Sequence, residues 1–205
     1  MFRRACLAAL PMLLAACASL PDAGPQDRFW QALQSHCSKA YAGRMVSDEA
    51  ADTDMRGAAM AMHVRECSAE GIAVPFHIRR ADGSWDRSRT WVFTRTAGGL
   101  RLKHDHRHED GSADVLTIYG GDTAGAGTAR VQDFPVDAES KALFAREDRT
   151  ASLTNVWRVE VDPTGTPGAT FAYRLLRDPP HARNFHVAFD LTQPIAPPPA
   201  PWGHD

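Results

Sequence analysis

Short runs of β-forming residues, each ended by turn residues, follow one another through most of this 205-residue chain. Many short strands at such regular spacing are typical of an all-β sandwich or barrel. We predict strands over residues 43–47, 59–66, 72–79, 88–96, 100–109, 113–119, 130–134, 152–161, 169–176 and 185–191. These strands occupy most of the chain, so the predicted fold has few helices.

Two links between these strands indicate that sequential strands are neighbours in the sheet. Residues 97–99 read AGG and residues 109–112 read EDGS, and both have the composition of hairpin turns. An Asp-Gly pair favours the primed turns that join adjacent antiparallel strands. The links therefore predict an antiparallel meander.

Two helices are predicted beside the strands. Asp27 can cap a helix that runs to about residue 40, because Trp30 and Leu33 fall on one helical face. A shorter helix over residues 138–146, capped by Asp137, precedes the last strands. The predicted fold class is thus mainly β: an antiparallel meander barrel of about ten strands with an N-terminal helix and one short helix.

The N-terminus reads MFRRACLAALPMLLAAC and has the basic start and short apolar run of a signal peptide. The apolar run is shorter than the roughly 20 residues that a transmembrane helix needs. Its end, LAAC at residues 14–17, resembles the lipobox of bacterial lipoproteins. The resemblance implies that residues 1–16 are removed, that Cys17 carries the lipid, and that Ala18 directs the protein to the outer membrane, facing the periplasm.

Cleavage before Cys17 would leave 189 residues, a length suited to one domain. We expect a lipidated tether at 17–26, a single β-barrel-like domain at 27–193, and a disordered, proline-rich tail at 194–205. The formal net charge is −2 and becomes −4 when two arginines leave with the signal peptide. A mildly acidic chain without a basic cluster gives no reason to expect nucleic acid as a partner.

Two cysteines, Cys37 and Cys67, remain once the signal peptide and Cys17 are set aside. In an exported protein such a pair most simply forms a disulfide, because the compartment is oxidising. The alternative is a zinc site built from both cysteines with His36 and His63, which requires the thiols to stay reduced. We predict the Cys37–Cys67 disulfide.

A helix followed by a long meander is similar in architecture to the lipocalin-like (calycin) barrels, although the Gly-x-Trp opening of those barrels is absent. The stretches HDHRHEDGS, from residue 104, and YGGDT, from residue 119, also resemble a family of uncharacterised bacterial secreted proteins and lipoproteins. The first resemblance is one of architecture only. The second implies no particular activity.

Three histidines alternate with charged residues in the predicted strand at 100–109, LRLKHDHRHE. Successive side chains of a strand face opposite sides, so His104, His106 and His108 continue the apolar row of Leu100 and Leu102. The charged residues between them are expected to face water. The histidines should therefore point into the barrel near one of its ends.

A two-residue turn at Asp110 and Gly111 sets the expected partners of this strand. The resulting pairs are His106 with Val115, His104 with Thr117, and Leu102 with Tyr119. On this register the ligand-binding candidates at the mouth of an inner cavity are His104, His106, His108, Thr117 and Tyr119.

The same histidines are candidate metal ligands. Residues two apart in a strand are separated by about 6.6 Å, so two imidazoles can share an ion, whereas residues four apart are about 13 Å apart. At most two of His104, His106 and His108 could therefore hold one zinc or other divalent ion, and no catalytic residue is assigned. His77 and His186 alternate with apolar residues and are expected to face solvent.

Three functional hypotheses are compatible with these features. The favoured one is a lipid-anchored cell-envelope protein whose barrel binds a small ligand without catalysis or has a structural role. The first alternative is a metal-dependent hydrolase in which two of the three histidines hold the metal that activates water. The second is an envelope scaffold that contacts other proteins and has no internal site. The expected partners are the membrane, through the lipid on Cys17, and a small ligand for the favoured hypothesis.

Overall fold

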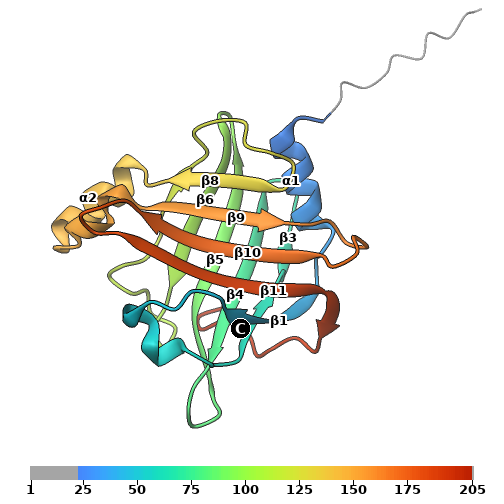
Figure 1. Cartoon of the computed structure of the whole chain (residues 1–205), viewed down its shortest axis with the longest axis horizontal. Helices are drawn as coiled ribbons and strands as arrows, with labels where there is room; N and C mark the ends of the chain where they lie inside the picture. The colour runs from blue at the N-terminus through green and yellow to red at the C-terminus, as the bar shows by residue number, and fades with distance from the viewer. Residues whose placement is uncertain (1–22, 205) are drawn as a thin grey trace, which may run out of the picture.

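Ten strands form a nearly closed antiparallel barrel in the computed structural model, which describes residues 23–204 (Figure 1). Around the barrel the order is β7-β6-β5-β4-β2-β1-β11-β10-β9-β8, and the two-residue strand β3 pairs with β4 outside this path. The strands are β1 (Ala40–Met45), β2 (Met60–His63), β3 (Glu66–Cys67), β4 (Gly71–Arg79), β5 (Trp85–Thr96), β6 (Gly99–His106), β7 (Tyr119–Asp122), β8 (Val131–Pro135), β9 (Val156–Val161), β10 (Thr170–Arg177) and β11 (Arg183–Ile195).

The prediction of a mainly β meander barrel is confirmed. Strands that follow one another along the barrel path are neighbours, except that β2 pairs with β4 past the short β3, and the first strand, β1, pairs with the last, β11. The predicted signal peptide and Cys17 lie outside the described residues. Among residues 23–204, no helix has both the length and the apolar character needed to cross a bilayer.

The barrel closes where β7 meets the end of β8, at a bridge between Gly121 and Val136. Two consecutive glycines allow this approach. A Cβ atom at Gly120 would lie 1.9 Å from the carbonyl oxygen of Leu102, and one at Gly121 would lie 1.8 Å from that of Pro135. Larger residues would force the strands apart, so the YGGD segment of β7 fits tightly between its two neighbours.

Helix α1 (Pro25–Gln34) packs at the barrel end where β5 turns into β6. Phe29, Trp30 and Leu33 on one face of the helix are fully or almost fully buried in the core. The predicted cap at Asp27 is wrong, because the helix begins at Pro25 with Gly24 as its N-cap and Asp27 lies in the first turn. The helix also ends at Gln34, earlier than predicted, and a turn in which Ser38 has a positive φ of 66° leads into β1. α1 thus covers one end of the barrel and leaves the other end to the site described below.

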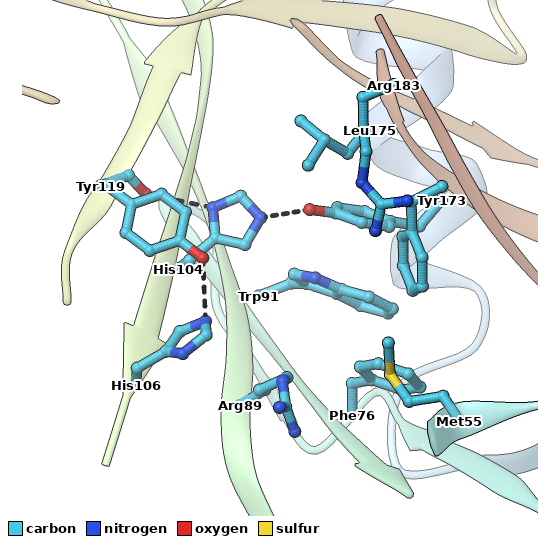
Figure 2. A pocket seen from close by; sticks show the side chains of 11 residues that line it. Met55, Phe76, Arg89, Trp91, His104, His106, Tyr119, Tyr173, Leu175 and Arg183 are labelled. Carbon is cyan, nitrogen blue, oxygen red and sulfur yellow. Dashed lines mark hydrogen bonds between the residues drawn. The ribbon is translucent and has the colours of Figure 1, made fainter. Parts of the chain in front are cut away.

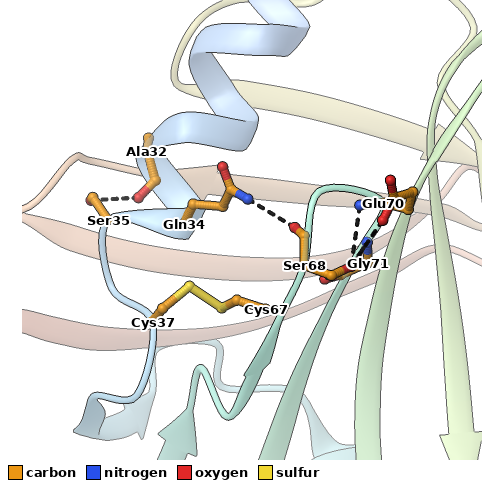
Figure 3. The surroundings of a disulfide bond; sticks show 8 residues. All are labelled: Ala32, Gln34, Ser35, Cys37, Cys67, Ser68, Glu70 and Gly71. Carbon is orange, nitrogen blue, oxygen red and sulfur yellow. Dashed lines mark hydrogen bonds between the residues drawn. A yellow bond between two sulfur atoms is a disulfide. The ribbon is translucent and has the colours of Figure 1, made fainter.

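The Cys37–Cys67 disulfide is confirmed and joins the segment after α1 to β3 (Figure 3). Close by, Gln34 at the end of α1 donates a hydrogen bond from Nε2 to the carbonyl oxygen of Ser68. Because both sulfur atoms are in the disulfide, the alternative zinc site with His36 and His63 is wrong. His36 instead binds the Asp162 carbonyl and the Tyr41 hydroxyl.

Helix α2 (Ala138–Arg146) begins as predicted at Asp137, whose carboxylate accepts a hydrogen bond from the backbone amide of Ser140. The helix lies outside the barrel beside β7, and carboxylates at its start lie next to the outer face of β6. Lys103 on that face is buried and forms ion pairs with Asp137 at 2.8 Å and Glu139 at 3.0 Å. The prediction that all the charged residues of this strand face water is therefore wrong for Lys103.

The prediction of an unpacked tail at 194–205 is also wrong for its described part, residues 194–204. β11 continues to Ile195, and the chain after it lies along the outside of the barrel. Arg87 of β5 donates a hydrogen bond to the Ala200 carbonyl at 2.7 Å, and the indole of Trp202 is 6% exposed. Prolines lose little conformational freedom on ordering, so a proline-rich segment with one large aromatic anchor can pack at small entropic cost.

This packed tail buries two residues that were expected in water. His77 of β4 is fully buried and bonds the Pro199 carbonyl through Nε2, whereas it was predicted to face solvent. Asp105 of β6 is 5% exposed and lies 2.7 Å from Nε2 of His204. His186, by contrast, is half-buried on the outer side of β11.

Candidate functional site

The histidine strand β6 is extended as far as His106 and places His104 and His106 on the interior side, in line with Leu100 and Leu102 (Figure 2). His108 was expected on the same face, and that prediction is wrong. It lies beyond the end of β6 and is exposed, because a turn bonds the His108 carbonyl to the amide of Gly111. Two histidines of the three therefore enter the barrel.

The pairing register between β6 and the strand that follows it differs by two residues from the expected register. His104 pairs with Tyr119 rather than Thr117, and the predicted strand at 113–119 is mostly irregular. Two features of this loop account for the difference: the Asp114 carboxylate binds the amide of Leu116, and Ile118 has a positive φ of 55°. The shift brings Tyr119 beside both inner histidines.

Thr117, a ligand-binding candidate from the sequence, has a structural role instead. Its hydroxyl oxygen accepts a hydrogen bond from the backbone amide of His106 at 2.8 Å and lies 3.3 Å from the Asp105 carboxylate. Val115, expected to face the interior, is 63% exposed. Of the candidates on the second strand, the cavity described below is lined by Tyr119.

His104 is a fully hydrogen-bonded, neutral core histidine. Its Nδ1 lies 3.1 Å from the Tyr119 carbonyl oxygen, which can only accept, so Nδ1 carries the hydrogen. Its Nε2 therefore accepts a hydrogen bond from the Tyr173 hydroxyl at 2.7 Å. Burial lowers the pKa of His104 to about 3, so the ring stays neutral at physiological pH.

His106 and Tyr119 form a second polar pair, in which the hydroxyl lies 3.1 Å from Nε2 (Figure 2). Burial, followed by the positive charge of Arg89, lowers the pKa of His106 to about 4. Burial raises the pKa of Tyr119 to about 12. Both side chains are therefore neutral. The imidazole carries one N–H and the hydroxyl one O–H, and the hydrogen bond between them uses one of these two hydrogens.

This geometry does not support the predicted metal site. Both ring nitrogens of His104 are engaged, and His108 is outside the barrel. Within residues 23–204, no group of three or more His, Cys, Asp or Glu side chains is arranged to hold a metal ion. The donor set for the metal-dependent hydrolase, whose metal would have been zinc or another divalent ion, is thus not assembled by the described part of the chain.

The inner histidines line a cavity at the barrel end opposite α1. One lobe has a volume of about 180 Å³ and a mainly apolar wall (Figure 2). Trp91 lies at the centre of this wall, stacked on Phe76 at 4.9 Å and on Tyr173 at 4.6 Å between ring centroids. The lining residues are Met55, Phe76, Arg89, Trp91, His104, His106, Tyr119, Tyr173, Leu175, Arg183 and Phe185.

A second pocket of about 270 Å³, called the second lobe below, has His106, Tyr119, Tyr173 and Leu175 in its lining as the first does. It extends toward α2 and the 3₁₀ helix η2 (Thr150–Thr154), and Phe144 and Trp157 form much of its apolar wall. Asn155 also lines it, is 4% exposed, and has a side-chain oxygen without a hydrogen-bond partner among residues 23–204. A buried acceptor of this kind is costly unless it is satisfied, so a bound donor at this position would be favourable.

The 3₁₀ helix η1 (Ala50–Met55) lies over the first lobe and contributes Met55 to it. Arg183 at the start of β11 fixes this segment: its guanidinium binds Asp52 with both terminal nitrogens, at 2.5 and 2.7 Å, and also pairs with Glu49. The charge of Arg183 is therefore balanced by the segment that it holds.

Sequence reasoning missed several lining residues. Arg89 shares the parity of Trp91 and Phe93 along its strand, so alternation alone could have placed it inside. Tyr173 could have been found in the same way from its strand. Arg183 and Met55 gave no such signal, because both lie where no strand or helix was predicted.

Comparisons with known proteins give no function for this site. No family model matches the chain, and none of the curated proteins matches its sequence.

Proposed function

We propose that this chain is a lipid-anchored protein of the cell envelope whose barrel binds a small ligand without catalysing a reaction. The observation that carries the proposal is the first lobe beside His104 and His106, together with the second lobe, which shares four lining residues with it. Its lining is mostly aromatic and aliphatic with a few converging polar groups, which is the usual composition of small-molecule sites. The neutral, hydrogen-bonded histidines suit recognition better than proton transfer at neutral pH, because their pKa values lie far below 7.

The proposed location follows from two features of the chain. The LAAC segment ending at Cys17 supports a lipid anchor, most simply at the outer membrane with the barrel in the periplasm. The Cys37–Cys67 disulfide is in keeping with an oxidising compartment. A barrel held at the membrane surface in this way would meet small molecules that cross or leave the envelope.

The proposal is tested by binding of N-phenyl-1-naphthylamine, a neutral dye that fluoresces in apolar surroundings, to the full chain in lipid nanodiscs. Empty nanodiscs supply the blank. We expect saturable binding that is lost in Leu175→Trp and Met55→Trp, because the first change fills both lobes and the second fills one of them. Val115→Trp, at a position 63% exposed, should bind like the wild type.

The cavity variants must first be shown to fold, by a cooperative thermal transition close to that of the wild type. Absence of saturable binding by the wild type would overturn the proposal. So would binding that persists unchanged in the folded Leu175→Trp and Met55→Trp variants, since the dye would then lie elsewhere.

A further inference from the structure

We infer that the cavity is built for an organic monocarboxylate, with its carboxylate at Arg89 and its apolar body against Trp91. This inference rests on the proposed function and specifies the chemical class of the ligand. It depends on the charges that line the first lobe, on the polar hydrogens that the lobe offers, and on its apolar wall.

The permanently charged side chains that line the first lobe are both positive. Arg89 and Arg183 face it, and its described lining contains no Asp or Glu. Arg183 is already paired with Asp52 and Glu49, so two carboxylates balance its single charge. Arg89 differs, because one of its terminal nitrogens binds one carboxylate, that of Asp86, at 2.6 Å.

Arg89 therefore has guanidinium hydrogens available for a second anion. A guanidinium presents five N–H donors in a planar fork, and the contact with Asp86 uses one nitrogen. Arg89 pairs with His106 in the β5–β6 ladder and lines the first lobe together with His106 and Tyr119 (Figure 2), so the cation lies on the cavity side of β5. One guanidinium can hold two carboxylates, as Arg183 does with Asp52 and Glu49, so Arg89 with its single partner Asp86 can bind one further carboxylate.

A further donor lies beside this cation. The neutral His106 ring and the Tyr119 hydroxyl own one polar hydrogen each, and the bond between them uses one. Whichever tautomer His106 adopts, the pair retains one hydrogen that this bond does not use. Arg89 and this pair can thus provide hydrogen bonds to the two oxygens of a carboxylate, which is an acceptor-only group.

The rest of the lobe is suited to an apolar body. Phe76, Trp91 and Phe185 supply aromatic surface, and Met55 and Leu175 supply aliphatic surface. The combination describes an amphiphilic or aromatic carboxylic acid.

The test uses three probes that share one ring system and differ in charge: 2-naphthoate, 2-naphthamide and 2-naphthylmethylamine. Each is titrated calorimetrically into the full chain in nanodiscs at pH 7.5, with empty nanodiscs as the blank. We expect naphthoate to bind about 10- to 100-fold more tightly than naphthamide, in line with a charge-assisted hydrogen bond. The amine should bind most weakly.

Arg89→Met and Arg89→Gln should reduce the affinity for naphthoate to that for naphthamide and leave the naphthamide affinity within about threefold of wild type. The matched control is Arg101→Met on the same sheet, because Arg101 pairs with Asp122 in a similar ion pair outside the cavity. That variant should keep the wild-type preference. If Arg89 variants do not fold, the ratio of the three affinities in the wild type still decides the question.

Equal or tighter binding of naphthamide by the wild type would overturn the monocarboxylate inference, as would a preference for naphthoate that survives in a folded Arg89 variant. Absence of binding by all three probes would overturn it too. In each of these cases saturable dye binding that requires Leu175 and Met55 would leave the proposed ligand-binding function standing, so the two failures can be told apart.

Discussion

The imidazole of His104 on β6 accepts a hydrogen bond from the hydroxyl of Tyr173 on β10 at 2.7 Å, although these strands are not neighbours in the sheet. The bond crosses the interior of the barrel and joins the strand that carries the two inner histidines to the opposite wall. It also fixes His104 as an acceptor at Nε2 and so removes that nitrogen from metal binding.

Loss of this bond should destabilise the fold. Tyr173→Phe leaves Nε2 of His104 buried without a donor, which should lower the free energy of unfolding by about 1–3 kcal/mol, as measured by urea denaturation. Tyr119→Phe is the comparison, and its cost should be smaller because its partner His106 is only partly buried. Wild-type stability in Tyr173→Phe would contradict the assignment of this hydrogen bond.

The pH dependence of stability should reveal the neutral state of His104. Its pKa is about 3 in the folded chain and about 6.5 when unfolded, so the unfolded state takes up a proton first as the pH falls. The stabilising contribution is complete above pH 6.5 and decreases toward pH 3, by about 1.4 kcal/mol per pH unit at most.

Other histidines with lowered pKa values act in the same direction, so the comparison must isolate His104. Urea titrations of the wild type and of His104→Gln at pH 6.5, 5.5 and 4.5 should give a steeper loss of stability for the wild type. Parallel curves would mean that His104 is not held neutral by the fold.

The Cys37–Cys67 disulfide should supply a large part of the stability. It closes a loop with a sequence separation of 30 residues, and its removal should lower the free energy of unfolding by about 3–4 kcal/mol on the chain-entropy model. Cys37→Ala, Cys67→Ala and the double variant should lose similar amounts in urea denaturation, because each change breaks the same bond. Unequal losses would assign a separate role to one of the cysteines.

The C-terminal segment should behave as part of the domain. Trp202 lies beneath the guanidinium groups of Arg80 and Arg87, at 5.1 and 6.0 Å, and is almost fully buried. Trp202→Ala should lower the free energy of unfolding by about 3 kcal/mol. Trp85→Ala serves as the control and should cost less, since Trp85 is only partly buried. An equal, small effect of both changes would indicate that the segment contributes little.

The proposed lipid anchor has a direct test. Cys17→Ser should abolish incorporation of a radioactive fatty acid and release the protein from the membrane fraction, whereas the wild type should be labelled. Cys67→Ser is a suitable control, because it removes a cysteine that is engaged in the disulfide. Labelling that persists in Cys17→Ser would refute the lipobox interpretation.

Local patterns of the sequence determined the architecture of this protein. Turn residues and β-forming runs predicted the meander, Asp137 predicted the start of α2, and strand parity predicted that His104 and His106 face the interior. These features depend on neighbours within a few residues, where backbone geometry and alternation are decisive. The oxidised pair Cys37 and Cys67 followed from the number of cysteines and the expected compartment.

Tertiary structure decided what surrounds those residues. The irregular loop before β7 moved Tyr119 next to His104, and the packed tail around Trp202 covered His77 and Asp105, which the local pattern had placed in water. Arg89 and Tyr173 meet the histidines because the barrel closes on itself. Alternation specifies which side of a strand is inside, but the partners found there come from distant segments, and their positions depend on the packing of the whole chain.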